Sequence, residues 1–179
     1  MKKYNTIFLD RDGTLNPDPG YIASLAQFTF YDFTFPALRL LAEKGNRFCI
    51  VTNQSGVSRG LIKQEDLDKI HEYVKSQFIE NSVPLLDIYI AIDLPDNATN
   101  RRKPGGGMLL EASRNHLISL NKSLIIGDSI NDIQAGKNLD MDTVLVLTGR
   151  GTQTMIDYPD LTPTAVVNNL KEAADWILE

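Results

Sequence analysis

The chain alternates short apolar runs with longer amphipathic stretches, and this pattern limits its fold more than any other feature. Most apolar runs are continuous, as is typical of strands that are covered on both faces of a parallel sheet. Expected strands are 6–10, 47–52, 86–92, 123–127, 143–147 and 164–167. Expected helices are 36–44, 63–81, 108–120, 130–139 and 170–178. This alternation predicts βαβ units with right-handed crossovers, and therefore an α/β fold.

Length and charge exclude several kinds of protein. The 179 residues fit one domain, 1–179, with a sizeable core. The formal net charge of -5 makes nucleic acid and anionic membranes improbable partners. No stretch approaches the roughly 20 apolar residues that span a bilayer, and the run after Met1 to Asn5 is too short for the core of a signal peptide. We therefore expect a cytoplasmic protein, and a monomer because no exposed apolar helix face stands out.

Acidic residues follow two of the expected strands. In doubly wound sheets, ligands bind beyond the carboxyl ends of the strands, so residues at these ends should converge. The first strand runs into D-R-D-G-T-L, which contains Asp10 and Asp12. One of these acids could attack phosphorus while the other transfers a proton. A bare D-x-D pattern also fits a solvated acidic turn. The fourth strand runs into G-D-S-I-N-D, which places Asp128 and Asp132 on one face of a helical turn. Either one could instead cap the helix.

Phosphate-binding groups follow two further strands. The second strand ends in T-N-Q-S-G from Thr52, whose hydroxyls, amides and backbone N–H groups could hold phosphate oxygens, although a polar turn fits as well. Arg101, Arg102 and Lys103 precede the next helix, where a basic run alone is usually solvated surface. We expect the glycine triplet 105–107 to be a flexible turn into that helix rather than a phosphate loop.

Together, and in this order, the four segments resemble the haloacid dehalogenase (HAD) superfamily of phosphohydrolases over roughly residues 6–150. D-R-D-G-T-L-N, T-N-Q-S-G-V-S-R-G and R-K-P look like its branch of heptose-1,7-bisphosphate 7-phosphatases and histidinol-phosphate phosphatases. The segment from Asn16 to Tyr21 is more similar to the heptose enzymes. The resemblance implies a three-layer, Rossmann-like, doubly wound sheet and a Mg²⁺-dependent phosphomonoesterase that forms an aspartyl-phosphate.

A sugar bisphosphate is the implied substrate, with histidinol phosphate or a nucleotide as alternatives. A non-catalytic phosphosugar-binding module is the alternative from a different class of protein. The complete pair of Asp10 and Asp12 disfavours such a module, since a binding protein has no use for a general acid.

The resemblance also implies a role for each residue. Asp10 is the nucleophile, and Asp12 protonates the leaving group and then activates water. Thr52 and Lys103 hold the phosphoryl group. Asp10, the backbone carbonyl of Asp12, and Asp128 bind Mg²⁺, and Asp132 orients the metal ligands or Lys103. Substrate contacts are expected from Asp18, Pro19, Gly20, Tyr21, Asn53, Gln54, Ser55, Arg59 and Arg102.

The chain departs from that branch before R-K-P, where residues 91–93 and 99–101 contain none of the Cys and His residues of its zinc loop. We therefore expect no structural zinc. Residues 15–35 are too few for an inserted folded domain, so we expect an open site without a large cap. His71 and His116 are expected to lie on the surface or be partly packed, rather than to take part in catalysis.

Overall fold

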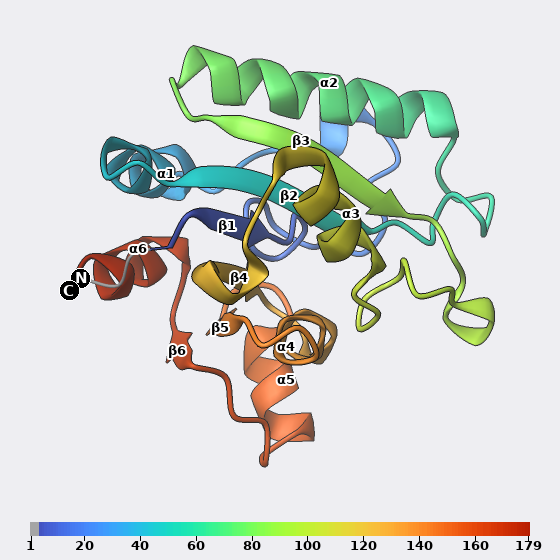
Figure 1. Ribbon diagram of the computed structural model, residues 1–179. Helices are drawn as coiled ribbons and strands as arrows, with labels where there is room; N and C mark the ends of the chain where they lie inside the picture. The colour runs from blue at the N-terminus through green and yellow to red at the C-terminus, as the bar shows by residue number, and fades with distance from the viewer. Residues whose placement is uncertain (1–3) are drawn as a thin grey trace.

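The computed structural model describes residues 4–179; residues 1–3, with which the expected domain 1–179 begins, lie outside the described part. A parallel sheet of strand order β3-β2-β1-β4-β5-β6 forms the centre (Figure 1). The six expected strands are confirmed, and no end differs by more than one residue. Their bounds are β1 Thr6–Leu9, β2 Arg47–Asn53, β3 Leu85–Ala91, β4 Ser123–Gly127, β5 Asp142–Val146 and β6 Ala165–Val167.

The five expected helices are confirmed, and a sixth lies between β5 and β6. Their bounds are α1 Thr34–Glu43, α2 Gln64–Glu80, α3 Gly107–His116, α4 Ile130–Lys137, α5 Gly151–Asp157 and α6 Leu170–Leu178. Two predicted ends were wrong. The helix expected to reach residue 120 ends at His116, because Leu117 takes a left-handed conformation (φ 52°) and is 90% exposed. The helix expected to reach residue 139 stops at Lys137, where Asn138 caps it.

Apolar side chains alternate between the two faces of the sheet and create two cores. On one face, Ile7 and Leu9 of β1 pack with apolar residues of α1, α2 and α6. On the other face, Phe8 packs with residues of α3 and α4. In Figure 1, α3 and α4 lie on the near side of the sheet, and α1 and α6 neighbour each other at one end. The result is the expected three-layer, doubly wound α/β fold.

The direction of the chain across the sheet reverses after β3. Strands β1 to β3 progress outward on one side, and β4 then pairs with the free side of β1, in register Leu9 with Ile126. The carboxyl ends of β1 and β4 therefore flank a topological switch point, where ligands bind in folds of this kind. Asp10 and Asp12 follow β1, and Asp128 and Asp132 follow β4, so these acids lie at the switch point.

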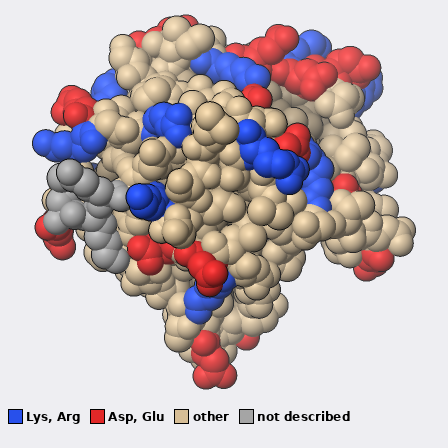
Figure 2. Space-filling view, viewed as in Figure 1, with Lys and Arg blue, Asp and Glu red and all other residues tan. Residues whose placement is uncertain are grey.

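Surface charge is mixed on the face seen in Figure 2, where Lys and Arg are dispersed among Asp and Glu rather than joined in one basic band. Within residues 4–179, no helix has both the length and the apolar character needed to cross a bilayer.

Candidate active site

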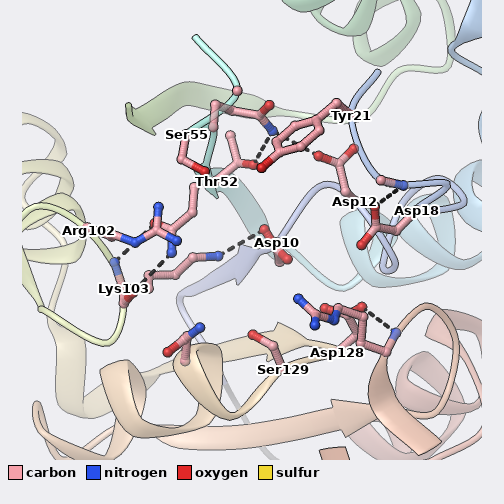
Figure 3. Close-up of a pocket in the computed structure, with 16 residues that line it drawn as sticks. Asp10, Asp12, Asp18, Tyr21, Thr52, Ser55, Arg102, Lys103, Asp128 and Ser129 are labelled. Carbon is pink, nitrogen blue, oxygen red and sulfur yellow. Dashed lines mark hydrogen bonds and ion pairs between the residues drawn. The ribbon is translucent and has the colours of Figure 1, made fainter. Parts of the chain in front are cut away.

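A cleft of about 510 Å³ opens at the carboxyl ends of β1, β2 and β4 (Figure 3). It contains most of the residues that the sequence singled out, although they come from distant segments. It is lined by Asp10, Asp12, Asp18, Gly20, Tyr21, Thr52, Asn53, Gln54, Ser55, Gly56, Arg102, Lys103, Asp128, Ser129, Asn131 and Arg150.

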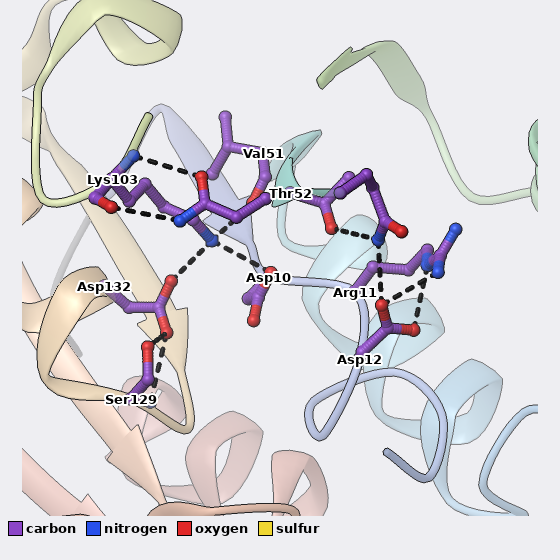
Figure 4. A network of polar contacts seen from close by, with 10 residues as sticks. Asp10, Arg11, Asp12, Val51, Thr52, Lys103, Ser129 and Asp132 are labelled. Carbon is purple, nitrogen blue, oxygen red and sulfur yellow. Dashed lines mark hydrogen bonds and ion pairs between the residues drawn. The ribbon is translucent and has the colours of Figure 1, made fainter. Parts of the chain in front are cut away.

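Lys103 occupies the centre of a buried ionic network (Figure 4). Its side chain is only 3% exposed, and its Nζ donates to Asp10 Oδ1 at 2.9 Å, Asp132 Oδ1 at 2.6 Å and the Val51 carbonyl at 2.7 Å. All three ammonium protons thus have acceptors. Burial alone would lower the pKa of Lys103, but the two carboxylates raise it above its usual value, so the side chain stays charged.

Asp132 lies behind the cleft and does not line it. Its Oδ1 accepts from Lys103, and its Oδ2 accepts from the backbone N–H and the hydroxyl of Ser129. The latter contacts form a capping box at the start of α4. Both expected roles, helix cap and orienting group for Lys103, therefore have contacts in the structure.

Asp128 is fixed by two glycines. Its Oδ2 accepts from the Arg150 backbone N–H at 2.7 Å, and its carboxylate is packed against Gly13 and Gly149. A Cβ at either glycine would collide with this carboxylate, and both have positive φ, 81° and 55°. Glycine is needed here because only it combines this close approach with a left-handed backbone.

The donor set fits a divalent cation. Asp10, Asp128 and Asp132 each offer a carboxylate oxygen, and these oxygens lie within 4.8 Å of one another. With Lys103 included, the fully ionised cluster carries two net negative charges, which one Mg²⁺ neutralises. Burial and the neighbouring acids raise the pKa of Asp128 to about 8, and burial raises that of Asp10 to about 7 despite Lys103. Mg²⁺ prefers such hard oxygen ligands.

Asp12 is held by four donors instead. Both of its oxygens accept from the guanidinium of Arg11, and it also accepts from the side-chain amides of Asn16 and Gln54. Burial alone would raise the pKa of Asp12, but Arg11 and these amides lower it below its usual value. This carboxylate is therefore ionised while the one beside it, on Asp10, binds a proton more readily.

Two expected substrate ligands use their amides on the protein. Asn53 Nδ2 donates to the Lys103 carbonyl at 3.0 Å, and its Oδ1 accepts from the Lys103 N–H at 3.1 Å. Gln54 donates to Asp12 and to Thr52 Oγ1, each at 2.8 Å. These side chains line the cleft, but their polar groups join the segment after β2 to Lys103 and Asp12.

Arg102 lines the cleft as expected, whereas Pro19 and Arg59 do not. Asp18 accepts from the Gly20 N–H in a tight turn, which leaves Pro19 exposed. Arg59 follows one turn after Ser55 and is also exposed, outside the cleft. Its charge still lowers the pKa of Arg102, after the larger effect of burial, so the two cations lie near each other.

Among the lining residues, the sequence analysis gave no role to Ser129, Asn131 and Arg150, and it named Gly56 only as part of the T-N-Q-S-G segment. Arg150 follows β5, so the strand-end rule that identified the other segments applies to it too. The glycine triplet leads into α3 through a turn, as expected, but this turn is closely packed rather than loose. A Cβ on Gly105 or Gly107 would collide with the backbone of residues 100–102, so these glycines permit the start of α3 to pack against that segment.

Comparison with known proteins adds the family. A family model described as HAD-hydrolase-like matches residues 100–173. A Helicobacter pylori protein named D-glycero-beta-D-manno-heptose-1,7-bisphosphate 7-phosphatase is 34% identical over 174 residues, covering 96% of this chain and 95% of the relative. A Burkholderia mallei protein named D-glycero-alpha-D-manno-heptose-1,7-bisphosphate 7-phosphatase is 30% identical over 182 residues, covering 98% and 94%.

A solved structure agrees with these sequence matches. D,D-heptose 1,7-bisphosphate phosphatase from B. bronchiseptica, complexed with magnesium and phosphate, matches with a TM-score of 0.90 at 28% identity, over 97% of this chain and 98% of that one. With relatives at 30% identity or more along nearly the whole length, the chain belongs to the HAD superfamily of phosphatases, in the branch of the heptose-bisphosphate enzymes.

Proposed function

We propose that the chain removes one phosphate from a sugar bisphosphate of the D-glycero-D-manno-heptose 1,7-bisphosphate type, with Mg²⁺ and through a phosphorylated Asp10. The observation that carries the proposal is the buried cluster of three carboxylates around Lys103, which faces a cleft with two further cations, Arg102 and Arg150. Relatives named for this reaction give it further support.

The described contacts of Asp10 use only Oδ1, so Oδ2 is available for attack. Attack on phosphorus forms the Asp10–phosphate bond and breaks the bond from phosphorus to the sugar oxygen. Asp12, which is ionised before substrate binds, takes up a proton from solvent when the anionic phosphate enters beside it, and gives this proton to the sugar oxygen. Water, deprotonated by Asp12, then releases inorganic phosphate and restores Asp10. Lys103 and Thr52 stabilise the phosphoryl oxygens during both steps.

Magnesium held by Asp10, Asp128 and the backbone carbonyl of Asp12 supplies the charge that offsets repulsion between the nucleophile and the phosphate. The chain's own contribution is to keep these oxygens in place. Asp132 fixes Lys103, and the glycines beside Asp128 fix its carboxylate.

The second phosphate is assigned to Arg102. This side chain lines the cleft, and its Nη1 donates to the Asp93 carbonyl at 2.9 Å, which sets the direction of the guanidinium. A planar guanidinium can hold phosphate through two hydrogen bonds. Arg102→Ala should raise KM on a bisphosphate more than it lowers kcat, and should barely affect the matching monophosphate. An equal loss on both substrates would mean that Arg102 serves the transferred phosphate.

The direct test is phosphate release from a panel of phosphate esters. It contains both anomers of the heptose bisphosphate, histidinol phosphate and nucleotides, each with Mg²⁺ or with EDTA. We expect Mg²⁺-dependent release that is fastest from a heptose bisphosphate, and loss of turnover in Asp10→Asn. Release from none of the esters by the unmodified chain would overturn the proposal. Preference for histidinol phosphate or a nucleotide would replace the substrate while keeping the reaction.

We also propose that residues 1–179 act as one domain and one monomer in the cytoplasm. Two apolar cores that share a single sheet support one folding unit. The cytoplasm is proposed because a charged sugar phosphate does not cross a bilayer unaided. Light scattering after size exclusion should give the mass of one chain, 20.0 kDa, unfolding should show one transition, and cell fractionation tests the compartment. A dimer mass would contradict the monomer, two unfolding transitions would contradict the single domain, and recovery in the membrane fraction would contradict the cytoplasmic location.

A further inference from the structure

Arg11 has the largest fully buried side chain among the described residues, although it lies between two acids of the cleft. It does not line the cleft itself. Its Nε donates to Asp12 Oδ1 at 3.0 Å and its Nη2 to Asp12 Oδ2 at 2.8 Å, a two-pronged contact shown in Figure 4. Its carbon Cζ lies 5.6 Å from the centre of the Phe28 ring. The guanidinium thus reaches the reaction only through Asp12.

The remaining end of Arg11 is bound to His71, 60 residues away in α2. Arg11 Nη1 and His71 Nε2 lie 2.9 Å apart. A guanidinium has only donors, so Nε2 must be the acceptor and the imidazole must be neutral. The neighbours of His71 on the buried side of α2 are Leu67, Ile70 and Val74, and His71 itself is only 6% exposed. Burying a polar ring among apolar residues is costly unless the ring has a hydrogen-bond partner, and Arg11 is that partner.

All four lone-pair positions of the Asp12 carboxylate are occupied. Besides Arg11, Asn16 donates to Oδ1 and Gln54 donates to Oδ2, each at 2.8 Å. Proton exchange with a substrate therefore requires one donor to leave. Arg11 and Asn16 are fully buried, whereas Gln54 lines the cleft. Gln54 is consequently the donor that can yield, exposing Oδ2 while the other three keep the carboxylate in place.

We propose that His71 and Arg11 are positioning residues for Asp12: His71 fixes the plane of the guanidinium, and the guanidinium fixes both oxygens of the acid that exchanges protons with the substrate. The inference rests on the proposed role of Asp12 as general acid and base. It adds a residue from α2, outside the strand-end segments, to the machinery of the reaction.

The test substitutes His71, because replacing Arg11 would leave a cavity beside an unpaired carboxylate. His71→Leu suits the surrounding apolar stripe and removes the acceptor. His71→Gln keeps an acceptor for Arg11. His116→Leu is the matched control, since this partly buried histidine of α3 contacts the ring of Tyr89 on the opposite face of the sheet. Thermal unfolding of each variant checks that it is folded.

The measurement is the single-turnover rate of cleavage for two esters. A sugar phosphate has a poor leaving group that needs the proton of Asp12, whereas p-nitrophenyl phosphate has a good one that does not. A positioned general acid contributes roughly 10²–10⁴-fold, so a misplaced one should lose part of that. We expect His71→Leu to slow sugar phosphate cleavage about 10–100-fold and aryl phosphate cleavage less than about 3-fold. His71→Gln should recover most of the loss, and His116→Leu should match the unmodified chain.

An equal loss on both esters would overturn the inference, because it would mean a general disturbance of the cleft. Unchanged rates in His71→Leu would also overturn it, provided that Asp12→Asn in the same assay is slow on the sugar phosphate. If Asp12→Asn itself cleaves the sugar phosphate at the normal rate, the proposed role of Asp12 fails and the positioning role fails with it. The two failures are therefore distinguishable in one experiment.

Discussion

Replacing Lys103 by methionine should destabilise the metal-free protein strongly. Methionine keeps most of the volume of the stem, so packing changes little. The lost ammonium, however, leaves Asp10 and Asp132 as buried carboxylates without their shared cation, and it leaves the Val51 carbonyl without a donor. Breaking a buried ion pair by removing one partner costs about 3–5 kcal/mol. That is a large part of the about 5–15 kcal/mol that stabilises a typical domain.

The cost should depend on pH. Without Lys103, the pKa of Asp10 rises further above its value of about 4 in the unfolded chain, because the cation that opposes the effect of burial is gone. The folded state then binds more protons than the unfolded state as pH rises above that value, so stability falls with rising pH. The loss caused by Lys103→Met should consequently be larger at pH 8.5 than at pH 5.5. A loss due only to packing would be the same at both.

Urea unfolding in EDTA, followed by the fluorescence of the single tryptophan Trp176, measures this loss. The free energy of unfolding typically falls by about 2 kcal/mol per molar urea, so a loss of about 4 kcal/mol in that free energy lowers the urea midpoint by about 2 M. Adding Asp132→Asn to Lys103→Met should restore part of the stability, since one buried charge is gone while an amide oxygen can still cap α4. A loss below about 1 kcal/mol, or one that is equal at both pH values, would refute the reasoning.

The remaining predictions concern the metal site. In EDTA, the melting temperature of the unmodified protein should fall as pH rises from 4 to 8, because the raised pKa values of Asp128, about 8, and Asp10, about 7, make the folded chain bind more protons there; a rising melting temperature would contradict this. Mg²⁺ should raise the melting temperature more at pH 8.5 than at pH 6, because bound protons must leave before the metal binds; an equal rise would exclude that competition. Gly149→Ala should weaken Mg²⁺ binding, measured by calorimetry, because its Cβ would displace the Asp128 carboxylate. The control Gly60→Ala, at a glycine with positive φ and no atom within 4 Å, should lower stability through backbone strain but leave Mg²⁺ affinity unchanged. Equal Mg²⁺ affinity in both variants would contradict the role of Gly149 in placing Asp128.

The positions of the strands and of the main acids were predictable from the sequence. Continuous apolar runs identify buried parallel strands, and parallel strands bring their carboxyl ends to one edge, so Asp10, Thr52 and Asp128 had to converge. Helix ends were less predictable. Leu117 extends the apolar period of α3, yet it lies outside the helix in a left-handed conformation. The seven residues of α5 include only Met155 and Ile156 as large apolar residues, so no stripe marked the helix.

Side-chain partners were the least predictable feature. A polar turn after β2 indicates ligand contacts, but the pattern does not tell whether an amide faces the cleft or the protein. Asn53 and Gln54 both use their amides on neighbouring residues. The expectation that His71 is exposed or partly packed was wrong because Arg11, distant in sequence, gives it a buried partner. Its place in the apolar stripe of α2 was the one available signal.

The central claim is that Asp10 carries the phosphoryl group during turnover. Asp12→Asn should retain attack on p-nitrophenyl phosphate, whose leaving group needs no acid, but should hydrolyse the intermediate slowly. After incubation with this ester and Mg²⁺ and an acid quench, mass spectrometry of peptides should find one phosphoryl group on Asp10. The doubly substituted Asp10→Asn, Asp12→Asn chain should carry none. Normal turnover by Asp10→Asn, with no phosphorylated peptide in either variant, would contradict the account.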